Sequence, residues 1–278
     1  MMNELILEIY SEEIPARMQV EAQQQSQKLF EQILKSEGAV YSEVKNLGHQ
    51  TQTTSETRRG PRLGSPEAAL QGFSKSTGQT QDEWYQHDGY WFASIVQKGR
   101  SIVHILPEII EAFLDQFAWP KSMRWHNPQT TTFTRAWIRP IRSISCVYNA
   151  EPVVFKVSGL DLTTGNKTFG HRFLAPQSIT FKTFDDYHAN LKNAFVILDH
   201  QERQNMIKKG LEEKAASLGM GLQLQENQTL LEEVAGLVDY PFVHLGKIDP
   251  QFMNLPDQVL STSMRVHQKY FSFLKGDR

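Results

Sequence analysis

Short apolar runs alternate with amphipathic stretches along this chain, and together they predict both strands and helices. Residues 5–10 form an apolar run bounded by polar residues, as expected of a buried strand. Helical spacing of apolar residues follows from Pro15 to Glu37, with Pro15 suited to the first turn and Gly38 to the end. We therefore expect the chain to open with a strand and then a long helix.

The rest of the chain continues this mixture. Apolar runs predict strands at residues 90–97, 141–148, 153–157, 195–198 and 242–245. Helical spacing predicts helices at residues 102–117, 199–219, 230–238 and 256–270. Asp199 and Glu202 form a capping-box pattern, and the polar segment 46–64 is expected to be a loop. Since no regular βαβ rhythm appears, the sequence predicts an α+β fold with mixed or antiparallel sheets and packed helices.

Composition limits the class of protein. The 278 residues are 40% hydrophobic and include 16 Phe, 8 Tyr and 5 Trp, which is enough to build a core and argues against disorder. A single cysteine excludes an intrachain disulfide framework. The apolar runs are too short to span a membrane, and the start has no signal-peptide pattern. We expect a cytoplasmic protein without a membrane partner, and the aromatic-rich end suggests the front of a longer polypeptide.

The chain offers no obvious catalytic centre. No two of the nine histidines lie within five residues of each other, so no short-range metal pair exists. Residues 219–221 (GMG) lack the third glycine of a dinucleotide loop, and no phosphate-loop lysine motif occurs. Cys146 has apolar neighbours in a predicted strand, so we expect a buried, inert thiol. The sequence therefore predicts no catalytic residue, no metal ligand and no cofactor in this chain.

Charge is unevenly distributed although the net charge is only −2. Residues 119–172 hold eight cations and two acids (+6), whereas residues 226–257 hold one cation and six acids (−5). The basic segment has interleaved aromatics, as expected of a surface that meets phosphates. Alternatively, the two segments pack together and neutralise each other. Charge alone does not separate these two interpretations.

Three clusters in the basic segment combine cations with aromatic or titratable side chains. They are KSMRW at residues 121–125, RPIR at 139–142 and GHRF at 170–173. Arginine beside an aromatic plane suits stacking or phosphate contact. Each cluster has an equally simple structural interpretation, such as an arginine under a tryptophan or a histidine bonded to a buried carbonyl.

Seven short motifs follow one another along the chain: EIYSEEIP at 8–15, RGP at 59–61, PKSMRW at 120–125, RPIR at 139–142, GHRF at 170–173, LLEEVAGLVDYP at 230–241 and HQKYF at 267–271. In this order they resemble one family, the beta subunit of bacterial heterotetrameric glycyl-tRNA synthetase. The corresponding family motifs are EIGTEELP, KRGP, PKxMRW, RPVH, GHRF, LLEEVASLVEWP and DQKYF. Two departures matter. Residues 48–54 lack the arginines of the family's TPRRL strand, and Arg142 replaces a histidine, which favours phosphate contact over proton transfer.

The resemblance implies a fold and a division of labour. Residues 1–278 are expected to be an N-terminal region similar to the B3/B4 domain of the phenylalanyl-tRNA synthetase beta subunit, with two lobes divided near residues 175–185. HD-like and anticodon-binding domains are expected outside this chain. The implied partners are tRNA(Gly), not DNA, and an alpha subunit in a tetramer of two alpha and two beta subunits. ATP and magnesium are expected at that alpha subunit, where glycine is activated.

The candidate tRNA contacts combine the basic motifs and their neighbours. They are Arg58, Arg59, Arg62, Lys121, Arg124, Trp125, Arg139, Arg142, His171 and Arg172. Two other functions stay open. In a deacylase that edits mischarged tRNA, His171 would orient water; in a docking scaffold, the acidic 226–257 segment would meet the alpha subunit or later domains.

Overall fold

The computed structural model describes residues 4–41, 47–51, 54–97, 99–124, 135–217, 222–224 and 227–275. These residues form helices and small antiparallel sheets, which confirms the predicted α+β fold class. The helices are α1 (Ala16–Ser36), α2 (Glu67–Thr77), α3 (Ile102–Gln116), α4 (Phe184–Asn193), α5 (His200–Ser217), α6 (Gln228–Ala235), α7 (Asp257–Ser263), the 3-10 turns η1 (Gln81–Glu83) and η2 (Pro250–Phe252), and the π-helical turn η3 (Met264–Gln268). None of the helices described is long and apolar enough to cross a membrane.

The strands are short and pair in small groups. They are β1 (Leu5–Ser11), β2 (Ala39–Tyr41), β3 (Leu47–Thr51), β4 (Thr54–Arg62), β5 (Tyr85–His87), β6 (Tyr90–Gln97), β7 (Met123–Arg124), β8 (Ala136–Trp137), β9 (Ile141–Tyr148), β10 (Glu151–Pro152), β11 (Lys156–Val157), β12 (Leu162–Thr163), β13 (Lys167–Phe169), β14 (Ser178–Thr180), β15 (Leu222–Leu224) and β16 (Phe273–Lys275). The two three-stranded sheets have the orders β1-β9-β10 and β4-β6-β5.

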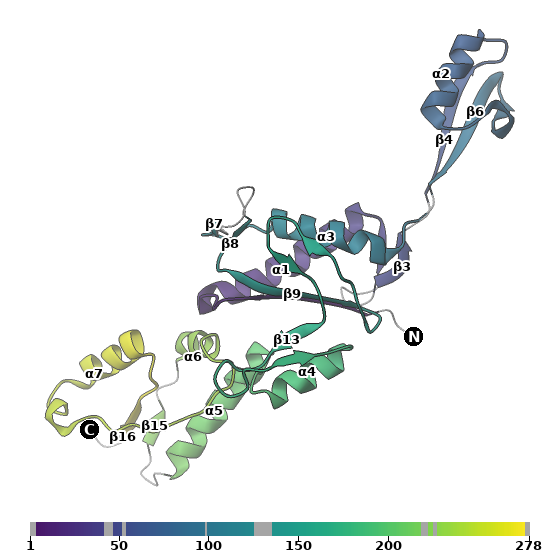
Figure 1. Cartoon of the computed structure of the whole chain (residues 1–278). Helices are drawn as coiled ribbons and strands as arrows, with labels where there is room; N and C mark the ends of the chain where they lie inside the picture. Colours follow the sequence, from purple (N-terminus) through teal and green to yellow (C-terminus); the bar gives the residue numbers. More distant parts are fainter. Residues whose placement is uncertain are drawn as a thin grey trace.

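The β1-β9-β10 sheet forms the middle layer of the body, because both of its faces are buried. In β1, Leu5, Leu7 and Ile9 contact the core shared with α1 and α3, and the alternate residue Ile6 contacts the opposite core. Figure 1 shows α1 and α3 on one side of β9, with β13 and α4 on the other. The strand predicted at residues 5–10 is thus confirmed, and its nearly continuous apolar run reflects the two covered faces.

Two predicted helices build the first core. Phe30 and Leu34 of α1 lie one turn apart, and Ile105, Ile109 and Phe113 repeat at the same spacing in α3. All five are buried in one cluster, where the rings of Phe30 and Phe113 meet edge to face at 5.8 Å. Helical spacing was therefore a correct guide here.

The second core lies between the sheet and α4, and the apolar pattern did not predict this helix. Phe181, Tyr187 and Leu191 pack against Ile6 and Val147 of the sheet. The helix is amphipathic but only ten residues long, so its apolar stripe amounts to a few positions.

Glu8 links these layers through a buried carboxylate. Its Oε2 atom accepts hydrogen bonds from the hydroxyls of Thr168 (2.7 Å) and Tyr187 (2.5 Å). Burial raises the pKa of the Glu8 carboxyl, and the two hydrogen bonds only partly oppose this effect. The ionised carboxylate is therefore less favourable in the folded protein than in the unfolded chain.

Glu8→Gln should increase stability above neutral pH. Because the folded pKa of Glu8 is raised, its contribution to stability is present below the unfolded pKa and is lost as pH rises through the folded pKa. Glutamine keeps an oxygen acceptor but carries no charge, so at pH 8 the variant should gain about 1 kcal/mol. Urea unfolding of both proteins between pH 4.5 and pH 8 measures this, and an advantage that did not grow with pH would contradict it.

The C-terminal part contains α5 and α6 packed together. Leu211 of α5 and Leu231 of α6 share a buried cluster, as the helical spacing predicted. Asp199 caps α5, because its carboxylate accepts the Glu202 amide at 2.7 Å, so the predicted N-cap is confirmed. The end of α6 reaches α1, where Gln19 Nε2 donates to the carbonyl of Gly236 at 2.9 Å.

A small lobe formed by residues 54–97 lies apart from the body in Figure 1. It consists of the β4-β6-β5 sheet with α2 on one face, around a core of Phe73, Trp84 and Ala93. The β5–β6 turn contains Asp88 and Gly89, both with positive φ (46° and 75°), as required by a two-residue type I′ hairpin.

The segment 46–64 was wrongly predicted to be a loop. Its described residues form β3 and β4, and β4 has the sequence TSETRRGPR, with no large apolar residue to indicate a strand. The helix α2, which covers the sheet beside it, was also not predicted. Alternation of apolar residues does not reveal β4, because the residues by which this strand contacts α2 are Arg58 and Gly60.

Three further strand predictions need correction. Residues 153–157 are not one strand, because only Lys156–Val157 lies in β11 and Glu151–Pro152 forms the short β10. Residues 195–198 and 242–245 form no strand. Phe195 has a φ of 60°, so the chain leaves α4 in a left-handed turn. Ile197 is buried, but its amide forms one backbone hydrogen bond, to the carbonyl of Asp239, and no strand ladder. The predicted division of the chain into two lobes near residues 175–185 stays a prediction.

Candidate nucleic-acid interface

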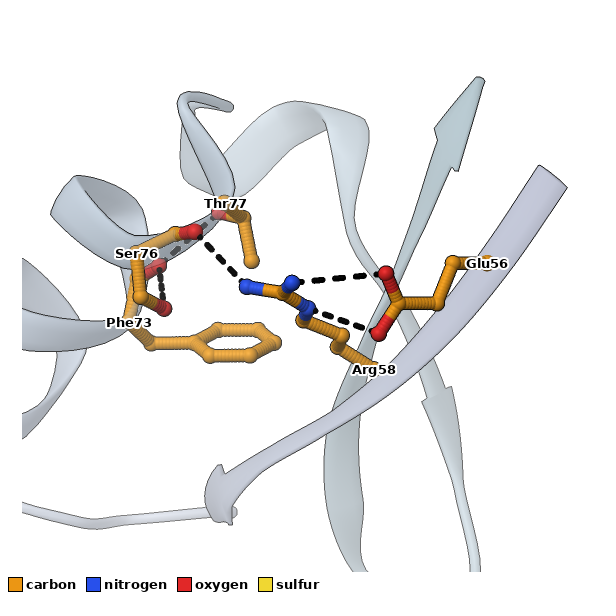
Figure 2. Close-up of polar contacts among 5 residues, drawn as sticks. All are labelled: Glu56, Arg58, Phe73, Ser76 and Thr77. Carbon is orange, nitrogen blue, oxygen red and sulfur yellow. Dashed lines mark hydrogen bonds and ion pairs between the residues drawn. The ribbon is translucent and has the colours of Figure 1, made fainter. Parts of the chain in front are cut away.

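The three arginines of β4 have different roles, which their adjacent positions in the sequence conceal. Arg58 lies on the α2 side of the strand, where its guanidinium is paired with Glu56 (Nε to Oε1, 2.9 Å) and donates to the Ser76 carbonyl at 3.1 Å. Figure 2 shows this bridge from β4 to the end of α2. Arg58 thus has a structural role, because it joins the strand to the helix.

Arg59 and Arg62 lie on the other side of the sheet and contact Tyr90. The guanidinium carbon of Arg59 is 3.6 Å from the centroid of the Tyr90 ring, and Arg62 Nε donates to the Tyr90 hydroxyl at 2.7 Å. This hydrogen bond lowers the pKa of Tyr90. Both arginines are exposed, and no carboxylate partner is found for either within the described ranges.

Gly60 explains the RGP turn between these arginines. A Cβ atom at this position would lie 2.5 Å from the ring of Phe73, which belongs to the core of the lobe. The glycine therefore allows α2 to pack directly on β4. The RGP motif, which contributes to the family resemblance, therefore has a packing role here.

Lys121, Arg124 and Arg139 lie around the small β7–β8 pair and are all exposed. In the part of the chain that the structure describes, these three side chains form no ion pair. Trp125 lies outside the described residues. The predicted stacking of this tryptophan beside Arg124 stays a prediction.

Arg142 is exposed but paired. Its guanidinium binds Glu12 through Nε (2.6 Å) and Nη2, which joins the start of β9 to the end of β1. The positive charge of Arg142 is balanced by the negative charge of Glu12. This ion pair makes Arg142 a weaker candidate for phosphate contact than the sequence suggested.

His171 and Arg172 belong to a tight turn after β13. His171 Nδ1 accepts the amides of Phe173 and Leu174 at 3.2 Å each, so one ring nitrogen is used structurally. Arg172 is exposed and lies 5.9 Å from the ring of Phe173, which is itself 81% exposed. This turn presents a cation and an aromatic plane, while its histidine stabilises the backbone.

The alternative in which the basic segment is neutralised by the acidic segment 226–257 is not seen among the described ion pairs, because the basic segment has other acidic partners. Glu12 pairs with Arg142, and Glu111 and Asp115 of α3 pair with Arg135. From the acidic segment, Glu233 pairs with Lys269. Among the described ion pairs, none joins residues 119–172 to residues 226–257. Part of the +6 charge is therefore balanced locally.

The body has a mostly apolar cavity. It has a volume of about 470 Å³ between α1 and the sheet, and is lined by Leu5, Leu7, Ile9, Ile14, Gln19, Ala22, Gln23, Ser26, Gln27, Phe30, Phe113, Phe117, Trp119 and Trp137. None of these side chains titrates, so the cavity offers no general acid or base. The described residues contain no group of three His, Cys, Asp or Glu side chains close enough to hold a metal ion. Cys146 is buried, as expected, and burial raises the pKa of its thiol to about 12.

Several aromatic residues of the lobe were not among the candidate contacts predicted from the sequence. Tyr85, His87 and Phe92 lie on the same side of the sheet as Arg59 and Tyr90. An Asp-Gly pair flanked by short alternating runs is a strong hairpin signal and could have indicated this arrangement. Which side stays open depends on α2 and could not be deduced from the hairpin alone.

The chain has an α+β fold, and its exposed Arg59 and Arg62 lie beside an aromatic ring. Comparison with known sequences identifies the protein family. Residues 5–278 match the family described as glycyl-tRNA synthetase beta subunit, and the chain belongs to that family.

Individual relatives agree. The chain is 39% identical over 285 residues to the "Glycine--tRNA ligase beta subunit" of Phenylobacterium zucineum (strain HLK1), covering 98% of this chain and 41% of the relative. It is 38% identical over 292 residues to that of Ruegeria sp. (strain TM1040) and 39% identical over 294 residues to that of Paracoccus denitrificans (strain Pd 1222), with the same coverage. The chain thus spans about two-fifths of the length of these curated relatives.

Proposed function

We propose that this chain is the front part of the beta subunit of a cytoplasmic glycine–tRNA ligase and that it binds and orients tRNA(Gly). The observation that carries the proposal is the family match over residues 5–278. Activation of glycine, with ATP and magnesium, belongs in this proposal to a separate alpha subunit.

The candidate contacts differ in what the structure says about them. Arg124, Arg139 and Arg172 are exposed and have no ion pair among the described residues, so they remain available to phosphates. Arg59 and Arg62 also remain candidates, on the lobe. Arg58 and Arg142 are engaged with acids in this chain, so each would bind phosphate only by giving up an ion pair.

Assembly with the alpha subunit is the second part of the proposal. The C-terminal part exposes several large apolar side chains: Leu237, Phe242, Leu245, Ile248, Phe252, Met253, Leu255, Val259, Val266 and Tyr270. Exposed apolar side chains gathered in one segment support contact with another polypeptide. The acidic residues of the same segment support selection of a basic partner.

The triple variant Arg124→Ala, Arg139→Ala, Arg172→Ala should bind tRNA(Gly) about 10- to 100-fold more weakly at moderate salt, because each phosphate contact also releases counterions. The slope of log affinity against log salt should fall by up to about 3. Filter binding of labelled tRNA(Gly) across a salt series measures both. The triple variant Lys28→Ala, Lys35→Ala, Lys208→Ala removes the same charge from exposed helical positions and should change affinity little.

Two outcomes would contradict the proposal. One is equal tRNA affinity of the arginine triple variant and the unaltered protein. The other is ATP–pyrophosphate exchange with glycine by this protein without an alpha subunit, since that would locate activation in this chain.

A further inference from the structure

The sheet of the 54–97 lobe has one covered face and one open face. On the covered face, Ala93 and Trp91 of β6 pack with Phe73 of α2. Side chains alternate along a strand, so the neighbours Tyr90 and Phe92 point to the opposite face. Within the described chain, no helix covers that opposite face; α2 lies only on the first (Figure 1).

The pairing register places a grid of side chains on the open face. Residues directly opposite each other on neighbouring strands share a face. The two cross-strand rows, read from β4 through β6 to β5, are Arg59–Phe92–Tyr85 and Arg62–Tyr90–His87. Every position in this grid is aromatic, cationic or an imidazole.

Two rings of the grid, Tyr85 and Phe92, are nearly parallel, and the imidazole of His87 meets Phe92 edge-on at 64°. Tyr85 and Phe92 lie with their planes only 21° apart and their centroids 5.8 Å apart, and Tyr85 is 46% exposed. His87 contacts the same Phe92 ring at 5.8 Å. Each strand holds its ring in place, so little side-chain freedom is lost when a second planar group stacks on this surface.

The cations of the grid are held by an aromatic ring and not by an acid. Arg59 lies flat over Tyr90 at 3.6 Å, and Arg62 is hydrogen-bonded to the hydroxyl of the same residue. Their charge is therefore available to an external anion. The nearest acid of the hairpin, Asp88, lies in the turn and is 3.4 Å from the imidazole of His87. By contrast, Arg58 on the covered face is neutralised by Glu56.

We propose that this open face binds unpaired nucleotides of an RNA, with bases stacking on Tyr85 and Phe92 and with phosphates meeting Arg59 and Arg62. Aromatic side chains on an open sheet beside cations are a common way to bind single-stranded RNA, because every base offers a planar surface. In a duplex, the bases are already stacked and cannot reach this face. The inference rests on the proposed function only for the identity of the RNA as tRNA(Gly).

The test compares short RNAs on the purified protein. Fluorescence anisotropy with a fluorescein-labelled single-stranded RNA octamer should show binding, and the same length of duplex RNA should bind more weakly. Tyr85→Leu should reduce octamer affinity about 10-fold with an unchanged salt slope, because it removes a stacking plane but no charge. Arg59→Ala should reduce affinity and lower the salt slope by about 1.

Matched variants separate stacking from unfolding of the lobe. Tyr85→Phe keeps the ring and should keep the affinity. Phe184→Leu removes a ring of similar exposure elsewhere (38%, against 46% for Tyr85) and should leave octamer affinity unchanged. Tryptophan fluorescence, to which Trp84 and Trp91 of the covered side contribute together with three other tryptophans, should be unchanged in Tyr85→Leu if the lobe is intact.

The outcomes distinguish this inference from the proposed function. If the unaltered protein did not bind tRNA(Gly), the proposed function would be overturned. Normal tRNA binding with no octamer binding, or with no effect of Tyr85→Leu, would overturn only the role of this face. A Tyr85→Leu variant that binds RNA normally but no longer co-purifies with an alpha subunit would show a protein-docking face and would also overturn it.

Discussion

Arg135→Ala should lower the free energy of unfolding by about 3–5 kcal/mol, because it leaves a partly buried carboxylate without its partner. Arg135 is only 5% exposed and was counted among the cations of the basic segment, so that assignment needs correction. Its guanidinium binds the carboxylate of Glu111, donates to the Ser158 carbonyl at 2.7 Å and lies 3.4 Å from Asp115. It joins α3 to the chain between β11 and β12 and contributes nothing to an outer surface.

Urea unfolding followed by far-UV circular dichroism measures this loss. Lys156→Ala, which removes an exposed cation of the same segment, should change stability by less than about 0.5 kcal/mol. Arg135→Lys keeps the charge but not the planar set of donors, so an intermediate loss is expected. A loss below 1 kcal/mol for Arg135→Ala would disprove the structural role.

Gly170→Ala should destabilise the protein by about 1–3 kcal/mol through steric overlap. A Cβ atom at Gly170 would lie 2.5 Å from the carbonyl oxygen of Ala175 and 2.6 Å from Cβ of Ala194. The backbone cannot move away easily, because His171 N donates to the Ala194 carbonyl at 2.8 Å and Ala175 N donates to the His171 carbonyl at 2.9 Å. The glycine of the GHRF motif thus holds the turn that presents Arg172.

The control for this variant is Gly165→Ala on the same stretch of chain. No atom lies within 4 Å of a Cβ at Gly165, so the change should cost little. Ala194→Gly in the Gly170→Ala background removes one of the two contacts and should restore part of the stability, which a double-mutant cycle measures. If both glycine variants unfolded at the same urea concentration, the packing explanation for Gly170 would be wrong.

The elements with long, regular apolar patterns were predictable, and the polar ones were not. The helices α1 and α3 carry apolar residues on their buried face in nearly every turn, so helical spacing predicts which of their residues lie in the core. The strand β4 has no such pattern, because its covered positions include Arg58 and Gly60. A strand stabilised by an ion pair and a close ring contact leaves no hydrophobic signal.

The roles of the basic residues were only partly predictable. Arg135 and Arg139 lie four residues apart and look alike in the sequence, yet the first is buried against α3 and the second is exposed. Arg58 and Arg59 are adjacent, and the strand's alternation sends one to the helix and the other to the open face. Charge counted along the chain cannot separate these cases, because burial depends on elements that are distant in sequence.

By itself, the sequence determined the family, the α+β class, the main helices, and the absence of a familiar catalytic or phosphate-loop motif. These depend on local pattern and on motif order, which a linear chain carries completely. Only the tertiary structure decided which arginines neutralise internal acids and which face outward, and that Tyr85 and Phe92 share a surface with Arg59. The physical reason is that the exposure and the ion pairs of a side chain depend on which helix covers it. The helix α2 covers one side of the strands beside it and leaves the other side to solvent, whereas Arg135 is buried against α3.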